Sequence, residues 1–346
     1  MIAHYPPHYK QFQCIAGKCP DSCCIGWDVV VDPASAAAYE KESAPIGEHI
    51  RSVLRKDEDG DFVFSKKANG NCPFLNRQNL CEIQCHLGEK ALCDTCRCFP
   101  RITQEYEGLI EHDLSITCPE AARMLFSLRP WELQLTAISN DTSAVIADPQ
   151  LQKLLSQREQ LFASFKDISQ PAVGQISACL RLSCQWEQRT FAKDVPCSST
   201  SCLQFLTGCS ILQPQWRSIL NRSLAGTYSP ENLLDSTLDK EIRAFAWDFL
   251  YRHYLQGISD DMASLRVQMM AFAVLSVLTI ICHDNDTPGA RTDLWRQFVK
   301  EIEYDAENLT LLEETLCTDP EFSCGALAAA LELLQEKPTD FDRRNV

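Results

Sequence analysis

The sequence CIAGKCPDSCC, from Cys14 to Cys24, contains four cysteines within eleven residues. The whole chain has 19 cysteines in 346 residues, and eleven of them lie at or before Cys118. The remaining eight are spread through the longer second part of the chain without a comparable cluster. This distribution predicts two domains, a cysteine-rich region over residues 1–128 and a second domain over residues 129–346.

The composition restricts what these cysteines do. Hydrophobic residues make up 45% of the chain, which is enough to bury a core without disulfide bonds. The opening stretch MIAHYPPHYKQF has no basic segment followed by an apolar run, so we expect a cytoplasmic protein. Disulfides rarely persist in the cytoplasm. The clustered thiols are therefore expected to be reduced.

Charge and hydropathy restrict the partners of the protein. A formal net charge of -15 opposes contact with phosphates, so we expect no nucleic-acid partner. The longest apolar run, Val267 to Cys282, is shorter than the roughly 20 residues that a bilayer crossing needs. We therefore predict a buried core helix here and no membrane partner. The sequence leaves the oligomeric state open.

The cysteine-rich region shows patterns of both helix and strand. Apolar and polar residues alternate on both sides of Gly108, which predicts a hairpin. The polar loop NRQN separates two short strand-like segments and predicts another hairpin. The strands of this second hairpin are expected over 72–75 and 80–83. The other expected elements are a helix over 34–55, a strand over 62–65 and a short helix in GEKALCDTC that ends before Pro100.

Beyond this region the pattern becomes helical. Pro119 suits the first position of a helix. Apolar residues recur every three or four positions in DKEIRAFAWDFLYRHYLQ and in TDLWRQFVKEIEY. We predict a mainly α (α+β) fold, in which a cysteine-rich N-terminal region with small β-hairpins around a metal site precedes an all-helical C-terminal region.

Metal ligation explains the clustered cysteines better than the alternatives do. Thiolates are preferred ligands of zinc and of iron-sulfur clusters. Free thiols that only fill a core have no reason to gather in tight loops. The spacings match neither paired zinc knuckles nor ferredoxins, so both kinds of metal remain open. His4 and His8 are further possible ligands, and the cysteines of the second domain are interpreted as packed thiols.

Several motifs follow one another in order through the first third of the chain. They are C-x4-C-x3-CC-x2-W from Cys14 to Trp27, CPFL, LCEIQ, GEKAL, TC-x2-FPR from Thr95 to Arg101, and LSITCPEAAR from Leu114 to Arg123. This series resembles the flagellin lysine-N-methylases of bacteria. It is also similar, more loosely, to CxxCxxCC-type zinc- or iron-chelating domains.

The resemblance implies methylation of lysine side chains on flagellin, with S-adenosylmethionine as methyl donor. It also implies an iron-sulfur cluster of the 4Fe-4S kind held by cysteines, with zinc as the alternative metal. Matched motif by motif, the family cysteines fall on Cys14, Cys19, Cys23, Cys24, Cys72, Cys81, Cys96 and Cys118.

Eight cysteines exceed the four thiolates that one 4Fe-4S cluster needs. Adjacent side chains such as Cys23 and Cys24 tend to point apart, so some of the eight can belong to a second site or support the first. Three further cysteines are additions of this sequence: Cys85, Cys93 and Cys98.

Three residues beside the cysteine motifs are candidates for binding the cofactor: Arg101, Gln84 and Glu89. The planar guanidinium of arginine suits the carboxylate of S-adenosylmethionine. Methyl transfer also needs a neutral lysine amine and hence a group that takes its proton. The sequence offers four carboxylates for this role without ranking them: Glu82, Glu89, Glu111 and Glu120.

Two functions without transferase activity remain open as alternatives. One is a metal-chelating or redox module, and the other is an assembly protein that the cluster stabilises. Neither alternative predicts binding of S-adenosylmethionine, which therefore separates them from a methyltransferase.

Overall fold

The computed structural model describes residues 1–26, 29–43, 45–139, 145–191, 196–227, 229, 236–283 and 291–334. Trp27, which ends the first cysteine motif, lies outside the described residues. The chain forms two compact units. Unit 1 comprises Met1–His8, Gln104–Glu111 and Arg123–Val346, and unit 2 comprises Tyr9–Thr103 and His112–Ala122. The domain division expected between residues 128 and 129 stays a prediction.

Unit 2 contains a small antiparallel sheet with the strand order β2-β4-β3. Its strands are β2 (Val30–Val31), β3 (Leu54–Lys56) and β4 (Phe62–Phe64). The strand predicted over 62–65 is thereby confirmed. Four helices accompany the sheet: α1 (Pro33–Lys41), α2 (Pro45–Val53), α3 (Glu82–Leu87) and α4 (Asp94–Cys98).

The single helix predicted over 34–55 is wrong, because the segment forms α1, α2 and strand β3. The Asp32 carboxylate caps the start of α1 by accepting a 2.8 Å hydrogen bond from the N–H of Ser35. Pro45 begins α2. Proline lacks an N–H and disfavours helical backbone in the residue before it, so one helix cannot run through this position unbroken.

The hairpin predicted from 72–75 and 80–83 is also wrong in large part. Only an isolated bridge joins Leu75 and Cys81. The Asn76 side chain accepts hydrogen bonds of 2.9 Å from the N–H of Gln78 and 3.0 Å from that of Leu80, which holds the chain in a tight loop. Helix α3 begins directly afterwards at Glu82, so no second strand forms. The helix expected in GEKALCDTC divides into the turn η3 (Glu89–Ala91) and α4.

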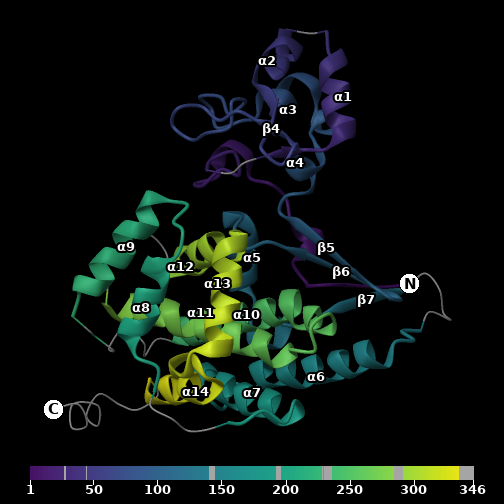
Figure 1. Ribbon diagram of the computed structural model, residues 1–346. Coiled ribbons are helices and arrows are strands. Elements are labelled where there is room, and N and C mark those ends of the chain that lie inside the picture. The colour runs from purple at the N-terminus through teal and green to yellow at the C-terminus, as the bar shows by residue number, and fades with distance from the viewer. Residues whose placement is uncertain are drawn as a thin grey trace. The chain divides into compact units, whose positions relative to one another are not determined.

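The hairpin predicted around Gly108 is confirmed as β5 (Arg101–Tyr106) and β6 (Leu109–Leu114), with Gly108 at a φ of +81°. These strands contribute residues to both units and belong to a sheet with the order β5-β6-β1-β7, part of which is seen in Figure 1. Strand β1 (Ile2–Tyr5) is parallel to β6 and antiparallel to β7 (Thr136–Ser139). Because β7 is a strand, the expectation of an all-helical C-terminal region is wrong at this point. A strand of four residues is too short for the alternation of apolar and polar residues to be recognised in the sequence.

The rest of unit 1 consists of helices, as predicted, and the fold is mainly α with small sheets. Helix α5 (Pro119–Ser127), which begins at the expected proline, bridges the sequence boundary of the two units. The further helices are α6 (Pro149–Lys166), α7 (Ala172–Trp186), α8 (Ser199–Gly208), α9 (Pro214–Ala225), α10 (Ser236–His253), α11 (Ala263–His283), α12 (Arg291–Phe298), α13 (Ala306–Thr318) and α14 (Cys324–Leu333).

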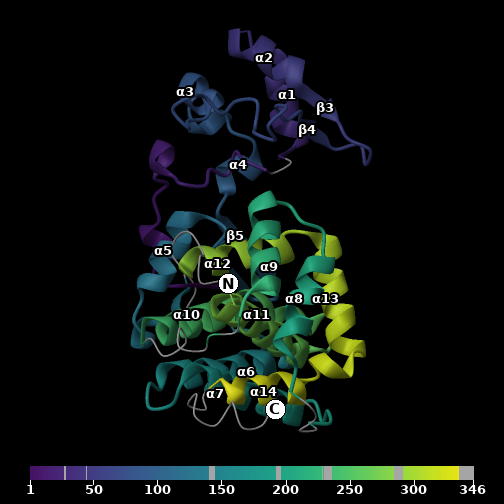
Figure 2. The ribbon, with the colours of Figure 1, turned by 90° about the vertical axis from the view of Figure 1, so that its left-hand side faces the viewer.

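Helix α11 forms the centre of unit 1. It packs against helices that include α7, α8, α10 and α14, and Figure 2 shows it among its neighbours. Every residue from Ala263 to Cys282 is buried. By length and composition alone this helix could cross a membrane, and it is the only one among the described residues that could. Its complete burial inside the protein confirms the predicted core helix.

Candidate functional site

Four of the eight family cysteines lie at the hydrophobic core of unit 2. Cys72 belongs to the buried cluster that includes Phe64 and Phe74, and three other cysteines pack against this cluster. We call these four the core thiol set: Cys24, Cys72, Cys81 and Cys96. They come from distant parts of the sequence, and folding of the small sheet and the short helices gathers them.

Cys24 is the centre of the contacts within this set. The N–H of Cys72 donates a 2.7 Å hydrogen bond to the carbonyl oxygen of Cys24. The thiols of Cys23 and Cys72 lower the pKa of Cys24, and the Cys24 thiol raises the pKa of each of them. The expectation that Cys23 and Cys24 point apart is therefore wrong, since their thiols contact each other.

Helix α4 carries Cys96 and is fixed to the start of α1. The Asp32 carboxylate, which caps α1, also accepts a 2.9 Å hydrogen bond from the N–H of Asp94. The Thr95 hydroxyl donates a 2.7 Å hydrogen bond to the carbonyl oxygen of Val30 in β2. These contacts place α4 beside the small sheet.

Cys93 is a cysteine of the site that sequence reasoning missed. It immediately precedes α4 and is fully buried in the core cluster, against which Cys96 packs. The Cys96 thiol lowers the pKa of Cys93, and the Cys93 thiol raises that of Cys96. The signal was present as the spacing C-x2-C at Cys93 and Cys96, which brings two thiols to one turn of a helix.

The other four family cysteines lie outside the hydrophobic cluster, and we call them the loop thiol set: Cys14, Cys19, Cys23 and Cys118. Cys118 precedes α5 and is 8% exposed. Burial raises the pKa of Cys118, and the charges of Cys19 and Cys14 raise it further. Cys23 likewise lies within electrostatic reach of Cys14 and Cys118. The eight family cysteines of unit 2 therefore form two groups of four, and Cys93 is a fifth thiol beside the first group.

The donor chemistry of these groups fits a thiolate-bound metal or cluster, because each offers four sulfur ligands. The side chains are not already arranged around an ion. Within the described ranges, no three or more His, Cys, Asp or Glu side chains converge in a geometry that could hold a metal. Metal binding would thus require thiol side chains to rotate from their hydrogen bonds toward the metal.

The three residues expected to bind a cofactor lie on three separate elements. Gln84 is on α3, Glu89 is in η3, and Arg101 begins β5, and all three are exposed. The Arg101 guanidinium lies 5.3 Å from the ring centroid of Phe12. The described structure records no side-chain contact between any two of the three, so it does not bring them together.

The histidines considered as ligands have other surroundings. His4 lies 3.3 Å from a carboxylate oxygen of Glu111. His8 is 2% exposed, and its ring nitrogens have no hydrogen-bond partner among the described residues. Burial lowers the pKa of His8 to about 4.

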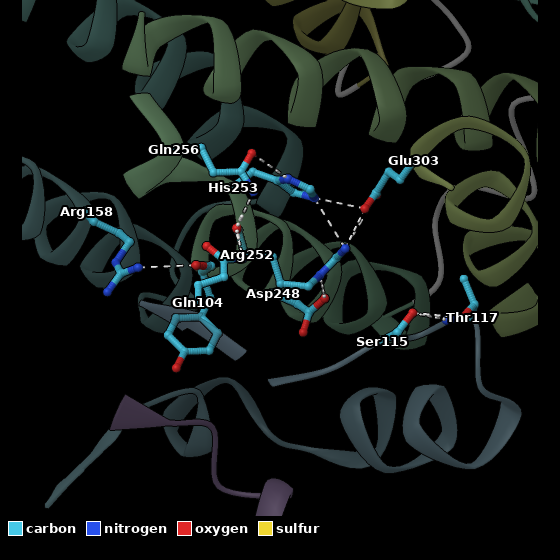
Figure 3. Close-up of polar contacts among 10 residues, drawn as sticks. Gln104, Ser115, Thr117, Arg158, Asp248, Arg252, His253, Gln256 and Glu303 are labelled. Atoms are coloured by element: carbon cyan, nitrogen blue, oxygen red, sulfur yellow. Dashed lines mark hydrogen bonds and ion pairs between the residues drawn. The ribbon is translucent and has the colours of Figure 1, made fainter. Parts of the chain in front are cut away.

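Sequence reasoning also missed a buried network of charges in unit 1. Figure 3 shows the Arg252 guanidinium between the carboxylates of Asp248 and Glu303. All three side chains are at most 3% exposed, and His253 lies 2.9 Å from Glu303. Burial raises the pKa of Glu303, but Arg252 and His253 more than offset this and lower it to about 2. The pair Asp248 and Arg252, four residues apart in a segment 244–252 whose other residues are alanine, leucine and aromatic residues, was the available signal.

Glu111 is the one proposed proton acceptor that the structure places in the interior. Its carboxylate accepts hydrogen bonds of 2.7 and 2.5 Å from the two Nη atoms of Arg158. Burial raises the pKa of Glu111, whereas the Arg158 charge lowers it below the ordinary value. A carboxylate held in this way is a poor base, so Glu111 has a structural role.

Most cysteines of unit 1 are buried, as predicted for packed thiols. Two close pairs occur among them. The sulfurs of Cys197 and Cys202 lie 3.6 Å apart, and the Cys324 thiol lowers the pKa of Cys184. Cys317 is exposed.

Comparison with known proteins identifies relatives of the chain. It is 32% identical over 127 residues to a lysine-N-methylase of Salmonella choleraesuis, a match that covers 35% of this chain and 32% of the relative. A lysine-N-methylase of Salmonella typhimurium is 31% identical over the same length, with the same coverage. The chain therefore spans about a third of the length of the lysine-N-methylases that it matches.

A third relative is matched over most of its length. The flagellar biosynthetic protein FliU of Salmonella muenchen is 31% identical over 127 residues, which cover 75% of that protein. No family model matches the chain, and no solved structure matches it. At this identity and coverage, the chain belongs to the family of FliU and the lysine-N-methylases.

Proposed function

We propose that the chain is a protein-lysine N-methyltransferase that transfers methyl groups from S-adenosylmethionine to lysine side chains of flagellin in the cytoplasm. The observation that carries this proposal is the match to two proteins named lysine-N-methylase, together with FliU, whose name places it in flagellar biosynthesis. The ordered cysteine motifs of the first third support the same assignment. The acidic charge of the chain is suited to a lysine-bearing protein surface.

The proposal includes an iron-sulfur cluster, with zinc as the alternative metal. The two groups of four thiols in unit 2 support it, because four thiolates are what one cluster takes. A cluster held by the core thiol set would cross-link segments that are distant in sequence and stabilise unit 2. The residues proposed to hold metal remain the eight family cysteines of the two thiol sets.

Cofactor binding by Arg101, Gln84 and Glu89 also remains part of the proposal. Arg101 would bind a carboxylate through its guanidinium, which has an exposed position at the start of β5. With Glu111 held by Arg158, the carboxylates left as proton acceptors for the substrate lysine are those of Glu82, Glu89 and Glu120.

The test is mass spectrometry of flagellin that has been co-expressed with the chain. Wild type should add methyl groups to lysine side chains. Cys96→Ser and Cys118→Ser should lose most of this activity, because a hydroxyl is a poor substitute for a thiolate on iron. Cys317→Ser, at an exposed position of unit 1, is the matched control and should methylate as wild type does. Flagellin without added methyl groups in the wild-type sample would contradict the proposal.

A second candidate is a metal-binding module without transferase activity. It is favoured by the coverage of the comparisons, since the match extends over only 32% of the lysine-N-methylases. Binding of S-adenosylmethionine to the purified chain, measured by calorimetry, separates the two. Metal-loaded protein that does not bind this cofactor would support the second candidate.

A further inference from the structure

A cavity of about 230 Å³ lies in unit 1, and no member of either thiol set lines it. Its walls come from the loop after α7, from α11 and from the segment that joins α13 to α14. Leu316 and Cys324 are buried parts of the lining, whereas Thr318 and Asp319 are exposed. The cavity is smaller than the roughly 300–1,000 Å³ of sites for drug-sized ligands, so its size suits a small molecule or one end of a larger one.

Gln268 of α11 brings an unused hydrogen-bond acceptor to this cavity. Its side chain is 1% exposed, and its Nε2 donates 2.8 Å hydrogen bonds to the carbonyl oxygens of Leu316 and Phe322. These two bonds fix the orientation of the amide. Its Oε1 has no partner among the described residues. A buried acceptor without a partner is costly, so a donor bound in the cavity would stabilise it.

Two helix ends of opposite partial charge meet at the cavity. Asp319, which lines it, is the C-cap of α13, where the last carbonyl groups carry a partial negative charge. Ser323, which also lines it, is the N-cap of α14, where the first N–H groups carry a partial positive charge. A ligand that carries both a positive and a negative group complements these two ends.

Arg189 adds a full positive charge to the lining of the cavity. Its Nη1 donates a 2.7 Å hydrogen bond to the Ser264 hydroxyl, and the N–H of Ser264 donates one of 2.7 Å to the Glu187 carboxylate. Ser264 lies four residues before Gln268, on the same face of α11. These contacts place the guanidinium beside the turn that carries Gln268. Its planar fork of N–H donors suits a carboxylate.

We infer that this cavity binds an α-amino acid group, with its carboxylate toward Arg189 and its ammonium toward Gln268 and Asp319. The small volume and the apolar side chains of Leu316 and Pro320 in the lining favour a short apolar side chain. A free amino acid such as methionine and the amino acid end of S-adenosylmethionine share this chemistry. The inference is independent of methyl transfer, because no residue assigned to that function lines the cavity.

The test is isothermal titration calorimetry of the full-length protein with L-methionine. L-Methionine should bind, whereas N-acetyl-L-methionine, which lacks the ammonium, and L-methioninamide, which lacks the carboxylate, should bind at least about tenfold more weakly. S-adenosylhomocysteine carries the same α-amino acid group. If it binds in competition with L-methionine, the cofactor is the source of this group, and if it does not compete, the source is a free amino acid.

Variants of the lining connect binding to this cavity. Arg189→Met should weaken binding of L-methionine by at least about tenfold. Asp319→Asn keeps an oxygen that can accept the 2.9 Å hydrogen bond from the N–H of Glu321, and it should weaken binding by a smaller factor. Arg181→Met is the matched control, because Arg181 does not line the cavity, and it should bind as wild type does.

Thermal unfolding of each variant shows whether it is folded. The inference is overturned if L-methionine does not bind to wild type, if the two blocked derivatives bind as tightly as L-methionine, or if folded Arg189→Met keeps the wild-type affinity. If Arg189→Met does not fold, Asp319→Asn decides, and an unchanged affinity in that variant would overturn the inference. Methylation of flagellin by a protein that does not bind L-methionine would refute this inference alone.

Discussion

The N–H of Cys72 donates a 2.7 Å hydrogen bond to the carbonyl oxygen of Cys24, and the Cys72 thiol lowers the pKa of the neighbouring Cys24 thiol. The hydrogen bond fixes the backbone of one segment against the other. The loop that carries the first cysteine cluster is thereby attached to the segment that contributes Phe74 to the core of unit 2. The Cys24 and Cys72 thiols are thus part of the packing of unit 2.

Metal removal should loosen unit 2 more than unit 1. A metal that binds only the folded state contributes its binding free energy to stability. Limited proteolysis of chelator-treated protein should therefore cut first within residues 9–103, while the segments after residue 123 resist. Metal-loaded protein is the control and should resist cleavage throughout this range. Equal cleavage of unit 2 with and without metal would show that the thiols do not stabilise it through a metal.

Removal of the Asp32 side chain should weaken both α1 and the attachment of α4. Its carboxylate accepts hydrogen bonds from the N–H groups of Ser35 and Asp94. Loss of a helix N-cap costs about 1 kcal/mol, so Asp32→Ala should lower the free energy of unfolding by about 1–2 kcal/mol. Asp32→Asn is the matched variant and should lose less, because its amide oxygen still accepts one of the two bonds. Urea denaturation of the three proteins measures the difference, and an unaffected Asp32→Ala would contradict this role.

The buried network of unit 1 should respond strongly to loss of Arg252. Removal of one partner from a buried ion pair leaves an uncompensated charge and typically costs about 3–5 kcal/mol. Arg252→Ala leaves both Asp248 and Glu303 without their guanidinium, so we expect a loss in that range. The control is Arg181→Ala, whose pair with Glu332 is 35% exposed on each side, and which should cost less than about 1 kcal/mol. Similar losses of unfolding free energy in the two variants would mean that burial does not determine how much these ion pairs contribute to stability.

The stability of unit 1 should decrease in acid partly because of His8. Burial lowers the pKa of His8 from 6.5 to about 4, so the folded state disfavours the protonated ring. The contribution of His8 to the free energy of unfolding is complete above pH 6.5. It is lost as the pH falls toward 4, because the unfolded chain then binds a proton that the folded chain does not. A shift of this size corresponds to about 3 kcal/mol.

The variant His8→Phe keeps a buried ring and removes the titrating group. Between pH 7 and pH 4.5, it should lose about 2–3 kcal/mol less of its free energy of unfolding than wild type does. Denaturant titrations at the two pH values provide the comparison. The same dependence on pH in both proteins would contradict the assignment of this loss to His8.

Sequence periodicity predicted long elements of the fold better than short ones. The core helix α11, the helix α10 and the hairpin around Gly108 each repeat their pattern often enough to be recognised. The helix expected over 34–55 failed because Pro45 starts a new helix. The hairpin expected at 72–83 failed because one side chain, Asn76, tightens the loop before α3 begins.

The residues of the candidate site could be predicted from the sequence, but their arrangement in space could not. The eight family cysteines follow from motifs in the sequence, but their division into two sets depends on which thiols fold against the core. The motifs leave Cys93 as an addition of this sequence, although its burial places it in the core cluster. Contacts between distant segments, such as those of Arg252 with Glu303, leave no local pattern in the sequence.

Methyl transfer to flagellin lysines is measured most directly with an isotopically labelled methyl group on S-adenosylmethionine. Purified metal-loaded chain, cofactor and folded flagellin are combined without oxygen under reducing conditions, and flagellin peptides are then sequenced by mass spectrometry. We predict label on lysine side chains, and none on a flagellin whose surface lysines have been replaced by arginine. Unlabelled flagellin after incubation with chain that retains its full metal content would contradict the claim.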